Sequence, residues 1–202
     1  MAAIALSAVC LTSCNDDFMQ RDPHTEITQK NYFNTEQDLR LYCYGLVNTP
    51  AYSYIGDAGT DDQATTDNVT IKNIMTSTNP TSTTIDAGWD WKRLYDINYF
   101  LDNCQKADVS DDVMAHWVGV ARYYRAEFYM TMVKKYSDVP WCDHTLATND
   151  DALYGKRDSR ETVMQHVMDD YQYAADHVKA DQPKGAIDRW IVLASMARTA
   201  LY

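Results

Sequence analysis

The sequence is poor in the residue patterns that catalytic and phosphate-binding sites require. Only seven of its 202 residues are glycine, and none of them forms a glycine-rich loop that could cradle a phosphate. The patterns H-E-x-x-H and G-x-S-x-G are both absent, and the five histidines are scattered along the chain. Pairs of carboxylates are frequent, but a pair indicates catalysis only with a cleft and a raised pKa. We therefore predict a protein that is not an enzyme, has no catalytic residues and carries no cofactor.

Basic residues are also scarce. The 18 Lys and Arg stand against 29 Asp and Glu, which gives a formal net charge of −11. No basic stripe is present, so nucleic acid is excluded as a partner. Aromatic residues make up 12% of the chain, with fifteen tyrosines and five tryptophans. Helix packing can absorb most of them, whereas an exposed excess would suit a surface that stacks on sugar rings, and composition leaves both readings open.

The first residues have the pattern of a bacterial lipoprotein signal. Residues 1–13 are small and apolar, and Cys14 follows them. The tetrapeptide Leu11-Thr12-Ser13-Cys14 fits a lipobox, in which the cysteine sulfur receives a diacylglycerol. A short buried helix is the alternative, but an acidic run follows it and offers nothing to bury against. The run is too short to cross a membrane, which takes roughly 20 apolar residues. We predict a signal peptide over 1–13, lipidation at Cys14 and an extended tether over 14–34.

Three cysteines remain after the lipobox. Cys43 and Cys104 fall within helical patterns, so we expect buried free thiols rather than a disulfide. Cys142 and His144 form a C-x-H pair, but no second pair at metal-ligand spacing accompanies them. We therefore predict no metal site.

The strongest helical pattern lies between Trp117 and Trp141. Apolar residues recur there at intervals of three and four, in two rows on different sides of one helix. A helix with two apolar sides packs between neighbours, so this stretch is predicted to be the central helix. Lys134 and Lys135 fall in its last turn, where positive charge complements the helix dipole. Pro140 closes the region.

Other helices are indicated on both sides of this one. Thr35 has the form of an N-cap, and a helix is expected to open at Asp86 or Gly88. Asp158 heads an apparent capping box, and Asp188 is expected to cap a final helix. Helix pairs separated by turns indicate a mainly all-α fold, a tetratricopeptide-like array of helix pairs with long irregular loops.

The helical pattern breaks between Ala51 and Gly88. This stretch is rich in Ser, Thr, Asn and Asp, and so long a connection is usually functional or disordered. Three interpretations of this stretch stay open: a glycan site, a calcium site and a plain solvated loop. In the next helix, Trp91 and Tyr95 are interpreted as packing residues. Aromatic rings beside carboxylates and amides suit a bound glycan, and the candidate ligand-binding residues are Tyr52, Tyr54, Asp61, Asp62, Asn68 and Trp89.

Several segments resemble one known family. The run from Ala121 to Tyr129, followed by Tyr136-Ser137-Asp138-Val139-Pro140, resembles the core signature of the SusD/RagB family, usually a helix with "FLRA" and then "FGDVP". Ser137 in place of glycine is a departure from that pattern. Residues 91–99 resemble the family's "W-x-x-L-Y-x-x-I" motif, and residues 157–174 its "R-x-S-x-x-E-V" segment. The resemblance runs from Cys14 to Tyr202 in five ordered segments.

The resemblance implies a cell-surface lipoprotein held at the outer membrane by its lipid. Such a protein binds an oligosaccharide and delivers it to a SusC-like TonB-dependent transporter. A peptide-binding receptor of the RagB type, and a tetratricopeptide-like scaffold that binds only proteins, are the alternatives. Degenerate helical repeats are also implied.

The resemblance further implies that the chain is longer than this sequence. The last predicted helix is apolar and reaches Tyr202 without a Gly, Asn or Pro stop signal. Residues 35–202 are therefore expected to be an N-terminal SusD-like helical domain, truncated at its C-terminal end.

Overall fold

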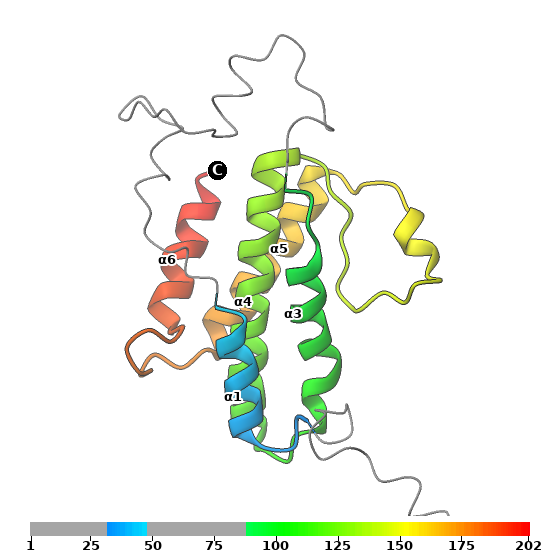
Figure 1. Ribbon diagram of the computed structural model, residues 1–202. Coiled ribbons are helices and arrows are strands. Elements are labelled where there is room, and N and C mark those ends of the chain that lie inside the picture. Colours follow the sequence, from blue (N-terminus) through cyan, green and yellow to red (C-terminus); the bar gives the residue numbers. More distant parts are fainter. Residues whose placement is uncertain (1–31, 48–87) are drawn as a thin grey trace, which may run out of the picture.

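A computed structural model describes residues 32–47 and 88–202 of the protein. Five α-helices make up most of these ranges, and no β-strand occurs within them (Figure 1). Two short 3-10 helices, Cys104–Lys106 and Asp151–Tyr154, interrupt the connections. The α-helices are α1 (Glu36–Gly45), α3 (Lys92–Asn103), α4 (Asp111–Tyr136), α5 (Arg160–His177) and α6 (Arg189–Ala200).

The last four α-helices form two antiparallel pairs, and α4 is the central helix. Helix α3 runs against α4, and α5 runs against α6 (Figure 1). Helix α4 lies in the middle and contacts α1, α3 and α5. The mainly all-α, tetratricopeptide-like architecture predicted from the sequence is confirmed. Within the two described ranges, no helix is both long enough and apolar enough to span a bilayer.

Helix α4 is buried on several sides, as its two apolar rows predict. More than half of its 26 residues are buried. It begins at Asp111, six residues before Trp117, because Ser110 is extended and two acidic residues follow in the first turn. It ends at Tyr136, before Trp141. Gly119 allows a close approach to the C-terminal end of α5, since a Cβ there would lie 3.0 Å from the side chain of Val178.

Two of the predicted helix caps are confirmed. The Thr35 side chain accepts a hydrogen bond from the amide of Asp38, and the Asp38 carboxylate accepts one from the amide of Thr35. The carboxylate of Asp188 accepts a hydrogen bond from the amide of Ile191 at 2.8 Å. These caps fix the starts of α1 and α6.

Two other predicted helix starts were wrong. Helix α3 begins at Lys92 rather than at Asp86 or Gly88, because Gly88 has a left-handed φ of 67° and Asp90 binds the amide of Lys92. Helix α5 is capped by Ser159 and not by Asp158. The carboxylate of Asp158 instead binds a loop amide, as described below.

The cysteines behave as expected from their positions. Cys43 and Cys104 are buried free thiols, and Cys142 is half-buried and also free. Burial raises the pKa of Cys104 to about 11, so its thiol stays protonated at neutral pH.

Candidate ligand-binding site

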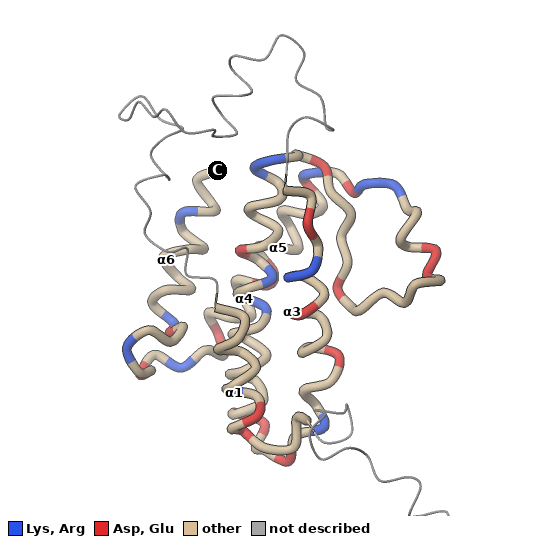
Figure 2. Tube along the Cα trace, viewed as in Figure 1, with Lys and Arg blue, Asp and Glu red and all other residues tan. Residues whose placement is uncertain are grey.

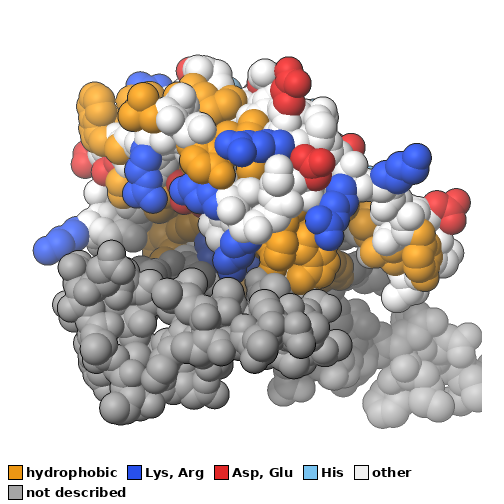
Figure 3. All heavy atoms as spheres, turned by 90° about the horizontal axis from the view of Figure 1, so that it is seen from above, with side chains coloured by type: hydrophobic (Ala, Val, Ile, Leu, Met, Phe, Trp, Pro, Cys, Tyr) orange, Lys and Arg blue, Asp and Glu red, His pale blue; other side chains and the backbone are white. Residues whose placement is uncertain are grey.

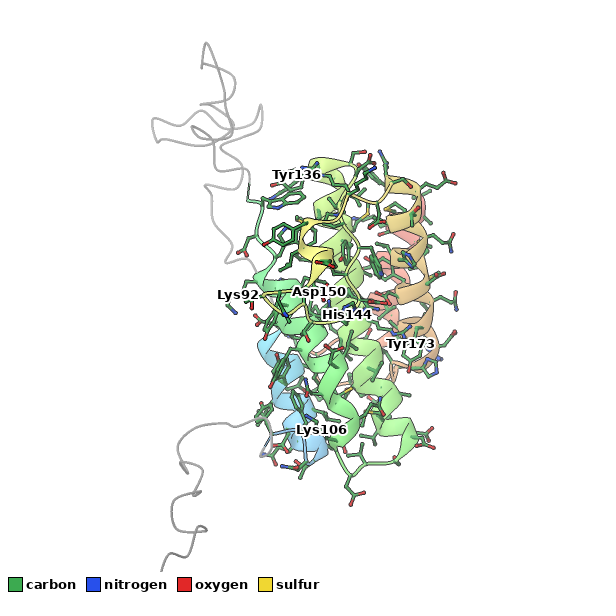
Figure 4. All side chains as sticks on the ribbon, turned by 90° about the vertical axis from the view of Figure 1, so that its right-hand side faces the viewer. Lys92, Lys106, Tyr136, His144, Asp150 and Tyr173 are labelled. Carbon is green, nitrogen blue, oxygen red and sulfur yellow. The ribbon has the colours of Figure 1, made fainter. Side chains whose placement is uncertain are left out.

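A pocket of about 400 Å³ lies between the start of α3 and the connection from α4 to α5. Trp89, Trp91 and Tyr95 line it from the α3 side. His144 and Arg157 are among the residues that line it from the connection. Figure 4 faces this side of the bundle, where Lys92, His144 and Asp150 lie near one another. The pocket therefore combines aromatic rings with polar and charged groups, the usual make-up of a small-molecule site.

The connection that forms one pocket wall is closed at its base. Val139 and Asp158 form an isolated antiparallel bridge, with the Asp158 amide donating to the Val139 carbonyl at 3.1 Å. The Asp158 carboxylate accepts a hydrogen bond from the Trp141 amide at 2.7 Å. The Asp138 carboxylate accepts one from the Arg160 amide at 2.9 Å. The two ends are thus tied together, and the segment between them is a compact loop.

Ser137 explains why glycine is usual at its position in the motif. Its φ is 63°, in the left-handed region that a Cβ disfavours. It follows the last residue of α4, and its amide donates to the carbonyl of Val133 at 2.9 Å. The chain turns at Ser137 to leave α4 and start the loop, and this turn requires the positive φ.

Ser137→Gly should therefore stabilise the protein, by about 1 kcal/mol, because the left-handed conformation is free of strain for glycine. Chemical denaturation of the full-length protein would measure the change. Ser159→Gly is the matched control, since Ser159 has a φ of −64° and its hydroxyl caps α5. That change should destabilise. A loss of stability in Ser137→Gly would contradict the role given to the φ angle.

Side chains from the helices hold the main chain of the loop in place. The Asn98 amide group donates to the carbonyls of Cys142 and His144, at 2.9 and 3.0 Å. The Asp102 carboxylate accepts from the amide and hydroxyl of Thr145, at 2.8 and 2.7 Å. The pocket wall is therefore preformed by hydrogen bonds to α3 rather than by a strand pairing.

A buried ion pair lies behind this wall. The guanidinium of Arg125 on α4 donates to both carboxylate oxygens of Asp170 on α5, at 2.6 and 2.8 Å. Arg125 is 6% exposed and Asp170 3%. A third donor of Arg125 reaches the carbonyl of Asp143 at 3.1 Å, and so links the ion pair to the loop. The three helices and the loop are thus joined by one polar network.

The aromatic residues at the pocket differ in how far they are exposed. Trp89 is 43% exposed, as predicted, and Trp91 packs on Phe128 and Tyr129. Tyr95, predicted to be a packing residue, is instead 51% exposed and stacks on Tyr99. Tyr95 lies one turn after the helix start, on the side that faces the pocket rather than α4.

Trp89 is held in a cluster at the end of α4. Its ring meets Trp91 edge to face at a centroid distance of 5.1 Å, and Tyr136 at 4.7 Å. The guanidinium of Arg157 lies over the ring, 4.8 Å from its centroid. This contact fixes the indole and brings a positive charge to the pocket.

His144 and Asp143 form an exposed pair at the pocket wall. Their side chains are 2.8 Å apart. Hydrogen bonding of the His144 ring to the Asp143 carboxylate raises the pKa of His144, and the same bond lowers the pKa of Asp143. No group of three residues that could hold a metal ion occurs in ranges 32–47 and 88–202.

Most of the predicted site residues lie outside the described part of the chain. Of the six ligand-binding candidates, only Trp89 falls within it, and Cys14 does not. The structure adds Tyr95, His144 and Arg157, which sequence reasoning did not select. Helical spacing could have placed Tyr95 on the outer side of α3, but the sequence holds no signal for the two loop residues.

Comparisons with known proteins show what the chain is similar to. No family model matches the sequence. The chain is 23% identical to a SusD-like protein of Formosa agariphila, over 88% of this chain and 38% of that protein. A SusD-like protein of Bacteroides fragilis has the same fold, with a TM-score of 0.66, 18% identity and coverage of 90% of this chain and 38% of that one.

Two further solved structures agree. A SusD-like carbohydrate binding protein of Bacteroides fragilis superposes with a TM-score of 0.69, at 19% identity, over 84% of this chain and 37% of its own. A SusD-like carbohydrate binding protein from Bacteroides vulgatus superposes with a TM-score of 0.61, at 18% identity, over 84% of this chain and 42% of its own. The resemblance drawn from the sequence is confirmed: this chain is similar to SusD-like proteins in sequence and in fold. It spans 38% of the length of the curated relative that it matches.

Proposed function

We propose that the chain belongs to a cell-surface lipoprotein that binds an oligosaccharide and passes it to a SusC-like TonB-dependent transporter. Cys14 would carry the lipid that holds the protein at the outer membrane. Residues 35–202 would be its N-terminal helical domain. Two of its structural neighbours are themselves named carbohydrate binding proteins. The protein would act by binding and handing over its ligand, without catalysis.

The observation that carries this proposal is the pair of exposed aromatic rings at the pocket. Trp89 and Tyr95 are each about half exposed, at 43% and 51%, and both line it. Flat apolar rings beside hydrogen-bonding groups are what a sugar requires, because its faces are apolar and its edges carry hydroxyls. The candidates Tyr52, Tyr54, Asp61, Asp62 and Asn68 remain a proposal for further contacts.

Trp89→Ala in the full-length protein should weaken oligosaccharide binding roughly ten- to thirtyfold, because truncating a central aromatic anchor commonly costs about 2 kcal/mol. Isothermal titration calorimetry, after a glycan array has identified a binder, would measure it. Trp190→Ala is the matched control: Trp190 is 65% exposed on α6 and does not line the pocket. Equal affinities in both variants and the wild type would remove this pocket from the site. Binding of peptides but no glycan would favour the RagB-type alternative.

A further inference from the structure

One end of the bundle carries a positive surface that the acidic composition does not predict. Lys134 and Lys135 end α4, and Arg157 and Arg160 flank the start of α5. All four side chains are exposed. Figure 2 shows blue segments at the end of α4, at the start of α5 and on the connection between them, and Figure 3 looks down on that end, where blue side chains stand among hydrophobic ones. The chain as a whole has a net charge of −11.

Within ranges 32–47 and 88–202, no ion pair includes these four cations. Four ion pairs occur among the described residues, and none of them includes Lys134, Lys135, Arg157 or Arg160. The nearby carboxylates of Asp138 and Asp158 are engaged by main-chain amides instead. Among the described residues, the four side chains are therefore exposed and make no ion pair with a carboxylate.

Helix stability accounts for only half of this surface. Lys134 and Lys135 lie in the last turn of α4, where positive charge is favourable. Arg160 is the first residue of α5, and Arg157 precedes it by three. Positive charge at a helix N-terminus opposes the dipole, so these two arginines are placed against the local electrostatic preference.

The arginines are oriented by aromatic rings. Arg157 lies over Trp89, and Arg160 lies over the ring of Tyr202 at 4.5 Å, with Lys134 over the same ring at 5.6 Å. A guanidinium stacked on a ring keeps the N–H donors at its edge free to bind a carboxylate or sulfate. The one hydrogen bond from Arg157, to the carbonyl of Asp138, is long at 3.5 Å. Arg157 also lines the pocket.

From this geometry we infer that the ligand is an acidic oligosaccharide, bearing carboxylate or sulfate groups; the inference rests on the proposed function. One sugar ring occupies the pocket beside Trp89 and Tyr95, and its acidic group binds the edge of the Arg157 guanidinium. The rest of the saccharide continues toward Arg160 and Lys134, whose charges meet further acidic groups. The Asp143 carboxylate, next to this wall, lies 2.8 Å from the ring of His144.

The test compares charged and neutral probes on the full-length protein. Oligogalacturonate supplies carboxylates, a sulfated galactan oligosaccharide supplies sulfates, and neutral galactan and xylan oligosaccharides supply neither. At least one acidic probe should bind, more weakly as salt is raised. Arg157→Gln should reduce that affinity roughly ten- to a hundredfold, since a charge-assisted hydrogen-bond pair is lost. Lys184→Gln, in the exposed turn before α6, is the charge-matched control and should change nothing.

Each outcome decides the matter. Preference for the carboxylate or the sulfate probe, with a loss in Arg157→Gln, supports the inference and names the anion. Tight binding of a neutral probe, unchanged in Arg157→Gln, overturns the acidic ligand and leaves the proposed function standing. Binding of neither acidic probe, by protein whose circular dichroism shows it to be folded, overturns the acidic ligand, while the absence of any binder on the glycan array overturns the proposed function.

Discussion

Arg125→Met should lower the free energy of unfolding by about 3–5 kcal/mol, because it leaves the carboxylate of Asp170 buried without its principal partner. The pair is desolvated on both sides, with exposed fractions of 6% and 3%. Its two short hydrogen bonds join α4 to α5 across the most extensive helix contact in the fold. Urea denaturation of the full-length protein, followed by circular dichroism, would measure the loss.

A second arginine provides the control for this change. Arg122 lies 3.9 Å from the same carboxylate, but its side chain is 35% exposed. Arg122→Met should cost at most about 1 kcal/mol, as for other partly solvated ion pairs. The double variant Arg125→Met/Asp170→Leu should lose less stability than Arg125→Met alone and Asp170→Leu alone lose in sum, because no unpaired charge remains buried in it. Additive losses would show that the two side chains are not coupled.

The sequence was a good guide to the helices because apolar spacing and capping chemistry are local. The two apolar rows of the 117–136 stretch report burial directly, and Thr35 and Asp188 cap as their side chains indicate. Asp158 does not cap α5 because its carboxylate binds a group distant in the sequence instead of an amide in the first turn of the helix. The amide of Trp141 binds its carboxylate, and Ser159, one residue later, is left to cap α5. Such competition depends on how the loop returns, which local sequence does not contain.

The candidate site was less predictable for the same reason. Arg125 and Asp170 both belong to recognised motifs, yet 45 residues separate them, and nothing in their spacing indicates a contact. The pocket is likewise formed by residues from α3 and from a loop about 50 positions later, and the hydrogen bonds of Asn98 and Asp102 join the two. Trp89 could be selected because an aromatic ring outside a helical pattern has no packing role assigned to it. Arg157 could not be selected, because its place at the pocket depends on its contact with the ring of Trp89, which the sequence does not indicate.

The polar network also bears on ligand binding. Arg125 and Asn98 bind carbonyls of residues 142–144, which lie in the pocket wall. Rigid support of this kind reduces the ordering that a ligand would otherwise have to impose. The same network therefore stabilises the fold and keeps the pocket in a binding-ready shape, and substitutions at Tyr129 test both effects.

Tyr129 joins the core of α4 to the pocket wall. Its side chain is fully buried, and its ring packs against Trp141 at a centroid distance of 4.3 Å. Its hydroxyl accepts a hydrogen bond from the Cys142 amide at 2.7 Å and donates to the Cys142 carbonyl at 3.3 Å. Burial raises the pKa of Tyr129 far above its ordinary value, so the hydroxyl keeps its proton and can make both bonds.

Two substitutions at Tyr129 should give graded losses of stability. Tyr129→Ala removes a large buried ring and should cost about 3–5 kcal/mol. Tyr129→Phe keeps the ring and leaves the amide of Cys142 without its partner, at a cost of about 1–3 kcal/mol. Tyr154→Phe is the control, because Tyr154 is 86% exposed and should change stability by no more than about 0.5 kcal/mol. Denaturant titration of the three variants would establish the order.

Because Cys142 lines the pocket, Tyr129→Phe should also weaken ligand binding while the helical content stays that of the wild type. Unchanged stability in Tyr129→Phe would mean that the hydroxyl does not hold the loop, and the pocket wall would then depend on its other supports, among them Asn98, Asp102 and Arg125.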